Sequence, residues 1–140
     1  MIILDTNVIS EVMRPEPATG VIEWLDRQTT ESLYITAVTV AEIAYGLRVL
    51  PDGARRRDLS RRVAAFLTEG FENRVLSFDL PAAHDYGEVM GHRREIGRPM
   101  SLADGQIAAI ARCHGMKLAT RNTRDFEACG VDLVNPFEQG

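Results

Sequence analysis

The chain has 140 residues, of which 45% are hydrophobic and 26% are charged, and its formal net charge is −4 at pH 7. This length and composition suit one packed domain, and we expect residues 1–140 to form a single domain. No apolar stretch approaches the roughly 20 residues that cross a bilayer, and the N-terminus turns polar at Asp5. We therefore exclude a membrane anchor and a secretory signal, and we expect a cytoplasmic protein.

Apolar runs of strand length alternate with helical patterns along the chain. In chain order, the patterns predict a strand at 1–4, a polar turn at 5–7, a short helix that ends before Pro15, a helix at 19–28, a strand at 33–37, helices at 39–50 and 55–69, a strand at 75–78, helices at 81–95 and 101–114, and strands at 117–120 and 131–134. This alternation indicates an α/β fold, with a parallel sheet covered by helices on both faces.

Four acidic residues are predicted near one edge of that sheet. In open parallel sheets, ligands bind beyond the carboxyl ends of the strands. Asp5 directly follows the first strand, Glu42 lies near the start of the helix after the second, and Asp125 follows the strand at 117–120. Asp104 lies in the first turn of a helix that precedes a strand, so it reaches this edge only if that helix starts there.

Each acid also has a purely structural explanation. Glu42 and Asp104 each lie three residues after a hydroxyl side chain, which is the spacing of a capping box. Asp5 fits a helix cap, and Asp125 fits an ordinary loop acid. The combination is more specific, because Asp5 ends an apolar strand, where an uncompensated charge is costly. Carboxylates crowded there repel one another unless a cation intervenes.

Oxygen ligands without histidine or cysteine favour the hard cations Mg²⁺ or Mn²⁺ over Zn²⁺. We therefore expect Asp5, Glu42, Asp104 and Asp125 to be both metal ligands and catalytic groups. Mg²⁺ held by a few carboxylates keeps bound water, which is a nucleophile for phosphodiester hydrolysis. The two cysteines have no metal-ligand spacing, and we expect them to be reduced packing residues. The acidic net charge neither excludes nor supports a nucleic-acid substrate.

Four segments carry a family resemblance: MIILDTNVISE, ITAVTVAEIAYGL, SLADGQIAAIA and LATRNTRDF. In this order they resemble the VapC/FitB-type PIN-domain toxins, over nearly the whole chain and with the FitB branch most similar. The resemblance implies a PIN-like three-layer α/β/α sandwich with a central parallel sheet. It also implies an endoribonuclease that uses Mg²⁺ or Mn²⁺ and serves as the toxin of a type II toxin–antitoxin pair. Family members usually form homodimers and bind a small antitoxin, and a higher toxin–antitoxin assembly on DNA is a further expectation.

The resemblance matches Asp5, Glu42 and Asp104 to the metal-binding acids of the family. The fourth position departs from the common pattern. Close relatives often carry an acid two residues after the threonine of the TR motif, where this chain has Asn122. The acid falls instead at Asp125, a variant that the family also shows. Whether Asn122 or Asp125 fills this position, and whether one or two metals bind, stays open.

Hydroxyl and amide side chains lie next to the acids, and we expect them to orient the carboxylates and water. They are Thr6, Asn7, Ser101, Thr120 and Asn122. Asn7 and Ser101 are equally well explained as helix N-caps. Arg121 and Arg124 are candidates for neutralising a substrate phosphate. The basic run at 55–62 is typical of a solvated helix face, with RNA or antitoxin contact as the alternative.

The main hypothesis is therefore an RNA hydrolase in which Asp5 and Asp104 hold the principal cation. Glu42 completes its shell or holds the attacking water, and Asp125, helped by Asn122, serves a second ion or the leaving group. A phosphoacceptor receiver or phosphatase-like domain is disfavoured, because it requires a second acid beside Asp5 and a lysine at the end of a late strand. A third alternative is a catalytically weak PIN-fold interaction module that acts through an antitoxin/DNA complex.

Overall fold

The computed structural model describes residues 1–138 and contains a five-stranded sheet. The strands are β1 (Ile2–Leu4), β2 (Leu33–Thr36), β3 (Val75–Leu76), β4 (Lys117–Ala119) and β5 (Leu133–Val134). Their order across the sheet is β3-β2-β1-β4-β5, and every neighbouring pair is parallel. Ile2 pairs with Leu33 on one side and with Lys117 on the other, so β1 is the central strand.

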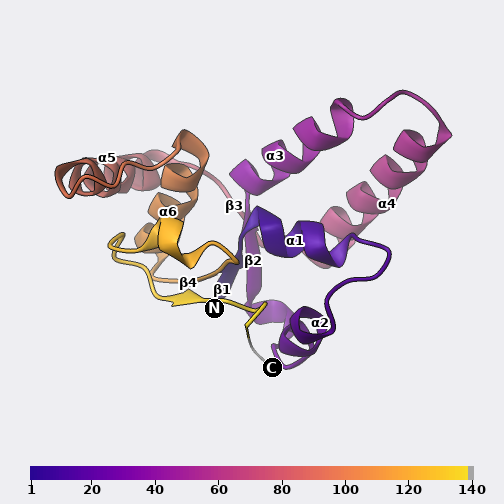
Figure 1. The fold of residues 1–140 in the computed structure, drawn as a ribbon, viewed down its shortest axis with the longest axis horizontal. Coiled ribbons are helices and arrows are strands. Elements are labelled where there is room, and N and C mark those ends of the chain that lie inside the picture. The colour runs from indigo at the N-terminus through magenta and orange to yellow at the C-terminus, as the bar shows by residue number, and fades with distance from the viewer. Residues whose placement is uncertain (139–140) are drawn as a thin grey trace.

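Within residues 1–138, six α-helices surround the sheet. They are α1 (Thr6–Val12), α2 (Thr19–Asp26), α3 (Ala37–Arg48), α4 (Ala54–Gly70), α5 (Leu80–Glu95) and α6 (Leu102–His114), joined by the short 3₁₀ helices η1 (Thr30–Ser32) and η2 (Thr123–Phe126). Figure 1 shows α5 and α6 on one side of the sheet and α1 and α2 on the other, while α3 and α4 form a projecting hairpin. The predicted three-layer α/β/α sandwich with a parallel sheet is confirmed.

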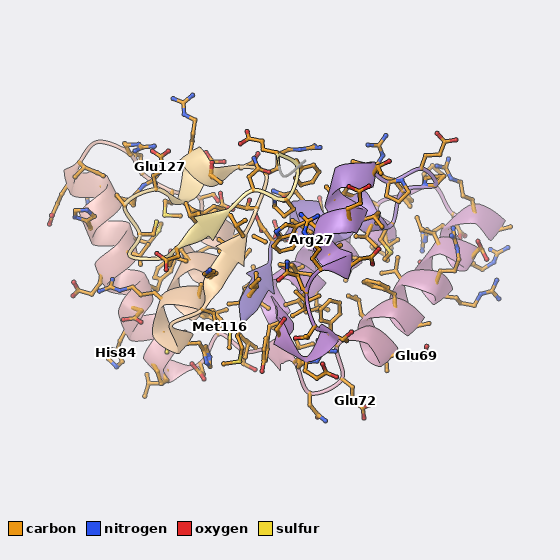
Figure 2. The ribbon with its side chains drawn as sticks, turned by 90° about the horizontal axis from the view of Figure 1, so that it is seen from below. Arg27, Glu69, Glu72, His84, Met116 and Glu127 are labelled. Atoms are coloured by element: carbon orange, nitrogen blue, oxygen red, sulfur yellow. The ribbon has the colours of Figure 1, made fainter. Side chains whose placement is uncertain are left out.

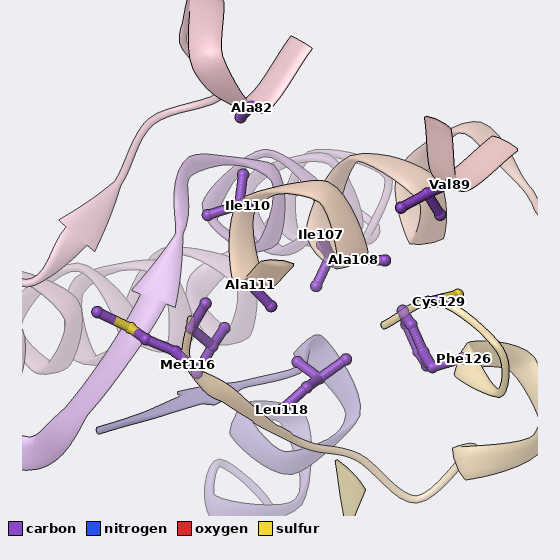
Figure 3. Packing of buried hydrophobic residues seen from close by; sticks show 11 residues of the cluster. Ala82, Val89, Ile107, Ala108, Ile110, Ala111, Met116, Leu118, Phe126 and Cys129 are labelled. Atoms are coloured by element: carbon purple, nitrogen blue, oxygen red, sulfur yellow. The ribbon is translucent and has the colours of Figure 1, made fainter. Parts of the chain in front are cut away.

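Alternate residues of the central strands enter two different cores, because successive side chains of a strand point to opposite faces. Ile3 and Leu118 pack with α5 and α6, in the core that Figure 3 shows around Ile107 and Ile110. Leu4 and Ala119 pack with the helices of the other side. The central strands are therefore covered on both faces, and only their ends are available for a polar site.

The start of α3 differs from the prediction. The helix begins at Ala37, and Thr36 is its N-cap, because Thr36 Oγ1 accepts a hydrogen bond of 3.1 Å from the backbone N–H of Thr39. Glu42 therefore lies beyond the first turn, and its interpretation as part of a capping box is wrong. The cap at Ser101 is confirmed, since Ser101 Oγ accepts from the Asp104 N–H at 3.2 Å.

Two further boundaries differ from those predicted. Asn7 is not an N-cap but lies inside α1, whose cap is Asp5. The strand predicted at 75–78 ends at Leu76, and Phe78 instead packs edge-on against Tyr86, with ring centroids 5.8 Å apart. The single-domain prediction spans 1–140, of which residues 139 and 140 lie outside the described residues.

Both helical layers expose charged side chains, together with apolar side chains such as Tyr45 of α3 and Leu80 of α5. Figure 2 shows Glu69 of α4 and His84 of α5 on opposite sides of the central sheet. In the basic run, Arg61 and Arg62 are exposed and lie 3.8 and 3.2 Å from Asp58, as expected for a solvated helix face. Among residues 1–138, no helix has the length and apolar character needed to span a membrane.

Candidate active site

A cleft of about 530 Å³ opens at the carboxyl end of the central strand. Seven of the sequence-predicted site residues line it: Asp5, Thr6, Asn7, Glu42, Asp104, Arg121 and Asn122. Three more lining residues, Ser10, Glu11 and Arg14, were not predicted. Asp5 directly follows β1, Asp104 lies in the first turn of α6, and Glu42 lies in the second turn of α3. The fold therefore brings together side chains that are far apart in sequence.

Asp5 is the most buried of these acids, with 5% of its surface exposed. Its backbone N–H donates to the Ala119 carbonyl at 2.9 Å, which extends the pairing of β1 with β4. Its Oδ1 accepts from the Thr6 N–H at 2.8 Å, and its Oδ2 accepts from Thr120 Oγ1 at 2.8 Å and Asn7 Nδ2 at 3.3 Å. The carboxylate is thus fixed by three donors from two segments.

The electrostatics of the cleft disfavour a full set of ionised acids. Burial raises the pKa of Asp5 from 3.8 to about 6, the hydrogen bond from Thr120 opposes this, and the charges of Asp104 and Glu42 add to the increase. Burial also raises the pKa of Asp104, against the hydrogen bond from its cap at Ser101, and Glu42 again adds repulsion. The charge of Glu42 is therefore close enough to disfavour ionisation of both Asp5 and Asp104.

Glu42 is held by a hydroxyl from a distant part of the chain. Thr6 Oγ1 donates to Glu42 Oε1 at 2.7 Å, although the two residues are 36 positions apart. The same Thr6 hydroxyl lies 3.0 Å from the hydroxyl of Thr39. Thr6 therefore links α1 to α3 and orients an otherwise exposed carboxylate.

Thr120 connects several of the predicted residues. It is fully buried, and its Oγ1 accepts from Asn7 Nδ2 at 3.2 Å and from the Asn122 N–H at 3.1 Å while it donates to Asp5. Asn7 Oδ1 in turn accepts from the Arg121 N–H at 3.1 Å. The segment after β4 is consequently fixed to the start of α1.

Asn122 and Asp125 are the two candidates for the fourth acid position of the family pattern, and they differ in location. Asn122 lines the cleft, whereas Asp125 is exposed on η2 and is not among the residues that line it. The charge of Asp125 nevertheless contributes to the raised pKa of Asp104. Arg124 is exposed on the same short helix, where its carbonyl accepts from Arg98 at 2.9 Å.

Glu11 is the main residue that sequence reasoning missed. It is 4% exposed, and its carboxylate accepts from the Ala18 N–H at 2.8 Å and from Arg14 at 3.3 Å. The hydrogen bond from Ala18 is the largest reason that the pKa of Glu11 is lowered. The available signal was spacing, because Asn7, Glu11 and Arg14 recur at intervals that share one face of a helix.

The donor set fits a hydrated hard cation better than a fully enclosed metal. Within residues 1–138, no group of three or more Asp, Glu, His or Cys side chains is arranged to hold a metal ion. Mg²⁺ commonly uses only one or two carboxylates and keeps several waters or phosphate oxygens. The oxygen-only lining and the raised pKa of Asp5 fit such an ion, because a nearby cation would offset the repulsion among the acids.

The chain is similar to known proteins over almost its full length. The PIN domain model matches residues 2–131. The VapC ribonuclease Y4jK of Sinorhizobium fredii is 45% identical over 138 residues, or 99% of each chain. Toxin FitB of Neisseria gonorrhoeae is 40% identical, over 98% of this chain and 99% of that protein. The solved structure of FitAB bound to an IR36 DNA fragment has a TM-score of 0.94 at 40% identity, covering 100% of this chain and 98% of that one. The chain therefore belongs to the PIN-domain family, as a VapC/FitB-type toxin.

Proposed function

We propose that this toxin is an endoribonuclease that depends on Mg²⁺ or Mn²⁺ and hydrolyses RNA phosphodiester bonds. The observation that carries the proposal is the convergence of Asp5, Glu42 and Asp104 on one cleft, where burial raises the pKa of Asp5 and the charges of Asp104 and Glu42 add to the increase. Such a cluster is suited to a divalent cation and through it to a phosphate. A relative 45% identical to this chain is named a VapC ribonuclease, which supports the same activity here.

In this proposal, Asp5 and Asp104 hold the principal cation, and Glu42 completes the set or receives a proton from the attacking water. Asp125, helped by the amide of Asn122, serves a second cation or the leaving-group side. A bound divalent cation would neutralise phosphate charge and lower the pKa of water. The positions of the acids in and beside the cleft support these roles.

The chain's own contacts prepare two of these groups. Thr120 and Asn7 hold one oxygen of Asp5, and the Thr6 N–H holds the other. Thr6 also fixes Oε1 of Glu42, and we assign the second oxygen of Glu42 to the water. Water attacks phosphorus, and Glu42 takes up the proton of the water. The bond from phosphorus to the ribose oxygen breaks, and that oxygen leaves with the electron pair and takes a proton from solvent to become a hydroxyl. No covalent bond to the protein forms.

We also propose a homodimer that binds a small antitoxin in the cytoplasm, with a higher assembly on DNA. A structure 40% identical to this chain was solved as FitAB bound to a DNA fragment, which supports an antitoxin partner and the DNA-bound assembly. The competing candidate is a catalytically weak interaction module. It is favoured by Asn122 in place of an acid and by the lack of a complete metal cage within residues 1–138.

Cleavage of RNA by toxin freshly separated from its antitoxin distinguishes the two candidates. We expect cleavage with Mg²⁺ or Mn²⁺ and none with EDTA. Asp5→Asn and Asp104→Asn should abolish cleavage while the variants still unfold cooperatively in urea. Asp26→Asn, the same change at an exposed position of α2, is the control and should cleave normally. Full activity of the Asp5/Asp104 double variant, or cleavage in EDTA, would contradict the proposal.

A further inference from the structure

A second charged cluster lies in the same cleft and is built on Glu11 instead of the proposed metal ligands. Its members are Glu11 of α1, Arg14 from the turn that follows α1, and Arg121 from the segment after β4, and all three line the cleft. The side chain of Glu11 is 4% exposed, whereas those of Arg14 and Arg121 are 64% and 54% exposed. A buried carboxylate therefore supports two cationic groups that remain accessible to a ligand.

The contacts of Glu11 leave donors of both arginines available. The Ala18 N–H donates to Glu11 Oε2 at 2.8 Å, and Arg14 Nη1 lies 3.3 Å from Oε1 and 3.4 Å from Oε2. Arg121 Nη2 is 3.8 Å from Oε1, which is an ion pair beyond hydrogen-bond distance. Each guanidinium has five N–H donors. Two guanidinium groups against one carboxylate leave a net positive charge in a cleft that otherwise carries acids.

Arg121 is also held on its other sides. Its guanidinium carbon lies 3.8 Å from the centroid of the Phe137 ring, a stacking distance that restricts the side chain. Its backbone N–H donates to Asn7 Oδ1 at 3.1 Å, and its carbonyl accepts from Asn135 Nδ2 at 3.3 Å. Because Asn7 also donates to Asp5, the backbone of Arg121 has a fixed position relative to the proposed metal site.

We infer that Arg14 and Arg121, positioned by Glu11, form a subsite for a non-scissile phosphate of the RNA strand beside the bond that is cut. This inference rests on the proposed ribonuclease function. Guanidinium groups bind phosphate through parallel N–H donors, and a stacked arginine retains its edge for that purpose. Glu11 is a positioning residue, because it contacts both arginines from a buried place.

The acidic character of the cleft and of the whole chain is a reason for RNA binding to need such a subsite. The acids in the cleft repel the phosphate backbone, and the whole chain carries a net charge of −4, so general attraction to RNA is weak. Contact with a phosphate next to the scissile one adds affinity without bringing a permanent positive charge onto the reacting phosphorus. It also fixes the register of the strand relative to Asp5.

The test measures steady-state cleavage of a short single-stranded RNA at several salt concentrations. Loss of a charged hydrogen-bonding contact in Arg121→Ala should raise KM about 10- to 100-fold with little change in kcat. The slope of log affinity against log salt should become shallower by about 0.7, the value for one phosphate of a single strand. Arg121→Lys should retain this slope and recover part of the lost KM. Arg27→Ala, an exposed arginine at the end of α2 that Figure 2 labels, is the control and should change neither.

The variant Glu11→Gln tests whether Glu11 positions the two arginines or whether only the net charge of the cluster matters. If the cluster acted only through its net charge, removal of the negative carboxylate would lower KM for RNA. If Glu11 positions the arginines, its loss releases them and KM rises while kcat changes little. A decrease of KM in Glu11→Gln therefore overturns the assignment. Arg14→Ala, at an exposed side chain, gives a second measurement if Glu11→Gln does not fold.

The outcomes also separate this inference from the proposed function. If the wild-type toxin with Mg²⁺ or Mn²⁺ neither binds nor cleaves RNA, both are wrong. If the wild type cleaves RNA but Arg121→Ala and Arg14→Ala keep the wild-type KM and salt slope, only the phosphate subsite is overturned. The phosphate subsite is likewise overturned if these variants change only the affinity for the antitoxin.

Discussion

Asp5→Asn removes a charge that the fold buries, and its effect on stability follows from the pKa of this carboxyl. The folded protein raises the pKa of Asp5 from 3.8 to about 6, with burial as the main cause. A folded-state pKa above the unfolded-state pKa means that the folded protein binds the proton more tightly. Protonation of Asp5 therefore adds to the free energy of unfolding. This stabilisation is fully present below pH 3.8 and is lost as the pH rises through about 6.

The magnitude follows from the same two values. One pKa unit corresponds to about 1.4 kcal/mol, so ionised Asp5 costs the fold about 3 kcal/mol above pH 6. Asparagine is uncharged and avoids this cost. Because its side chain has only one acceptor oxygen, it cannot accept from both Thr6 and Thr120, and the lost hydrogen bond reduces the gain in stability by about 1 to 2 kcal/mol. We therefore expect Asp5→Asn to be inactive yet more stable than the wild type by about 1 to 2 kcal/mol at neutral pH.

Urea unfolding in EDTA, followed by circular dichroism, measures this difference across pH. Between about pH 7.5 and 4.5 the advantage of Asp5→Asn should fall by about 2 kcal/mol, because the wild type takes up its proton in this range. Added Mg²⁺ should stabilise the wild type more than the variant, since a ligand of the folded state shifts unfolding. Asp26→Asn, at an exposed position, should show no comparable trend. A stability difference for Asp5→Asn that is constant with pH would refute the reasoning.

Two further predictions concern single side chains. Thr120→Val removes the hydroxyl that donates to Asp5 at 2.8 Å and should lower kcat/KM or Mn²⁺ affinity about 10- to 100-fold, as measured by metal titration of the cleavage rate, with Thr120→Ser nearer the wild type. A Cβ on Gly105 would overlap Met90 Sδ and lie 3.1 Å from Tyr86 Cε2, so Gly105→Ala should destabilise the protein by about 1 to 3 kcal/mol in urea unfolding. At Gly46, nothing lies within 4 Å of a new Cβ apart from its chain neighbours and the backbone of its own helix, so Gly46→Ala should instead stabilise α3 by about 0.5 to 1 kcal/mol. Equal effects at both glycines would contradict this account of packing.

The order and type of the elements could be predicted because the apolar pattern reflects burial on both faces of the sheet. Ile3 and Leu4 enter different cores, so β1 has a continuous apolar sequence. The end of β3 could not be predicted in the same way. Phe78 is as apolar as a strand residue, but it packs on Tyr86 after the pairing with β2 has ended.

The central acids of the site could be predicted from the sequence, but the hydrogen bonds and ion pairs between distant segments could not. Asp5 and Asp104 were identified from position in the fold pattern and from the family motifs, and both line the cleft. Glu42 was identified on the same grounds and also lines the cleft. Its alternative explanation through the hydroxyl three residues before it was wrong, because its actual partner is Thr6, 36 residues away. Glu11 was missed for a similar reason, because its contact with Arg121 joins segments that are distant in sequence and has no local signature.

The carboxylate of Asp5 accepts hydrogen bonds from Thr6, Asn7 and Thr120, and these bonds restrict where a proton can attach. Oδ2 already accepts from Thr120 and Asn7, which uses both of its lone pairs. Within the described chain Oδ1 accepts only from Thr6, so a proton and a cation would compete for the same lone pair. Acidification should therefore weaken binding of the cation, with a midpoint below about pH 6, because a bound cation lowers the pKa of Asp5 from its metal-free value. The pH and the concentration of the cation would therefore together set how much of the toxin carries the cation, because proton and cation compete for the same oxygen atom of Asp5.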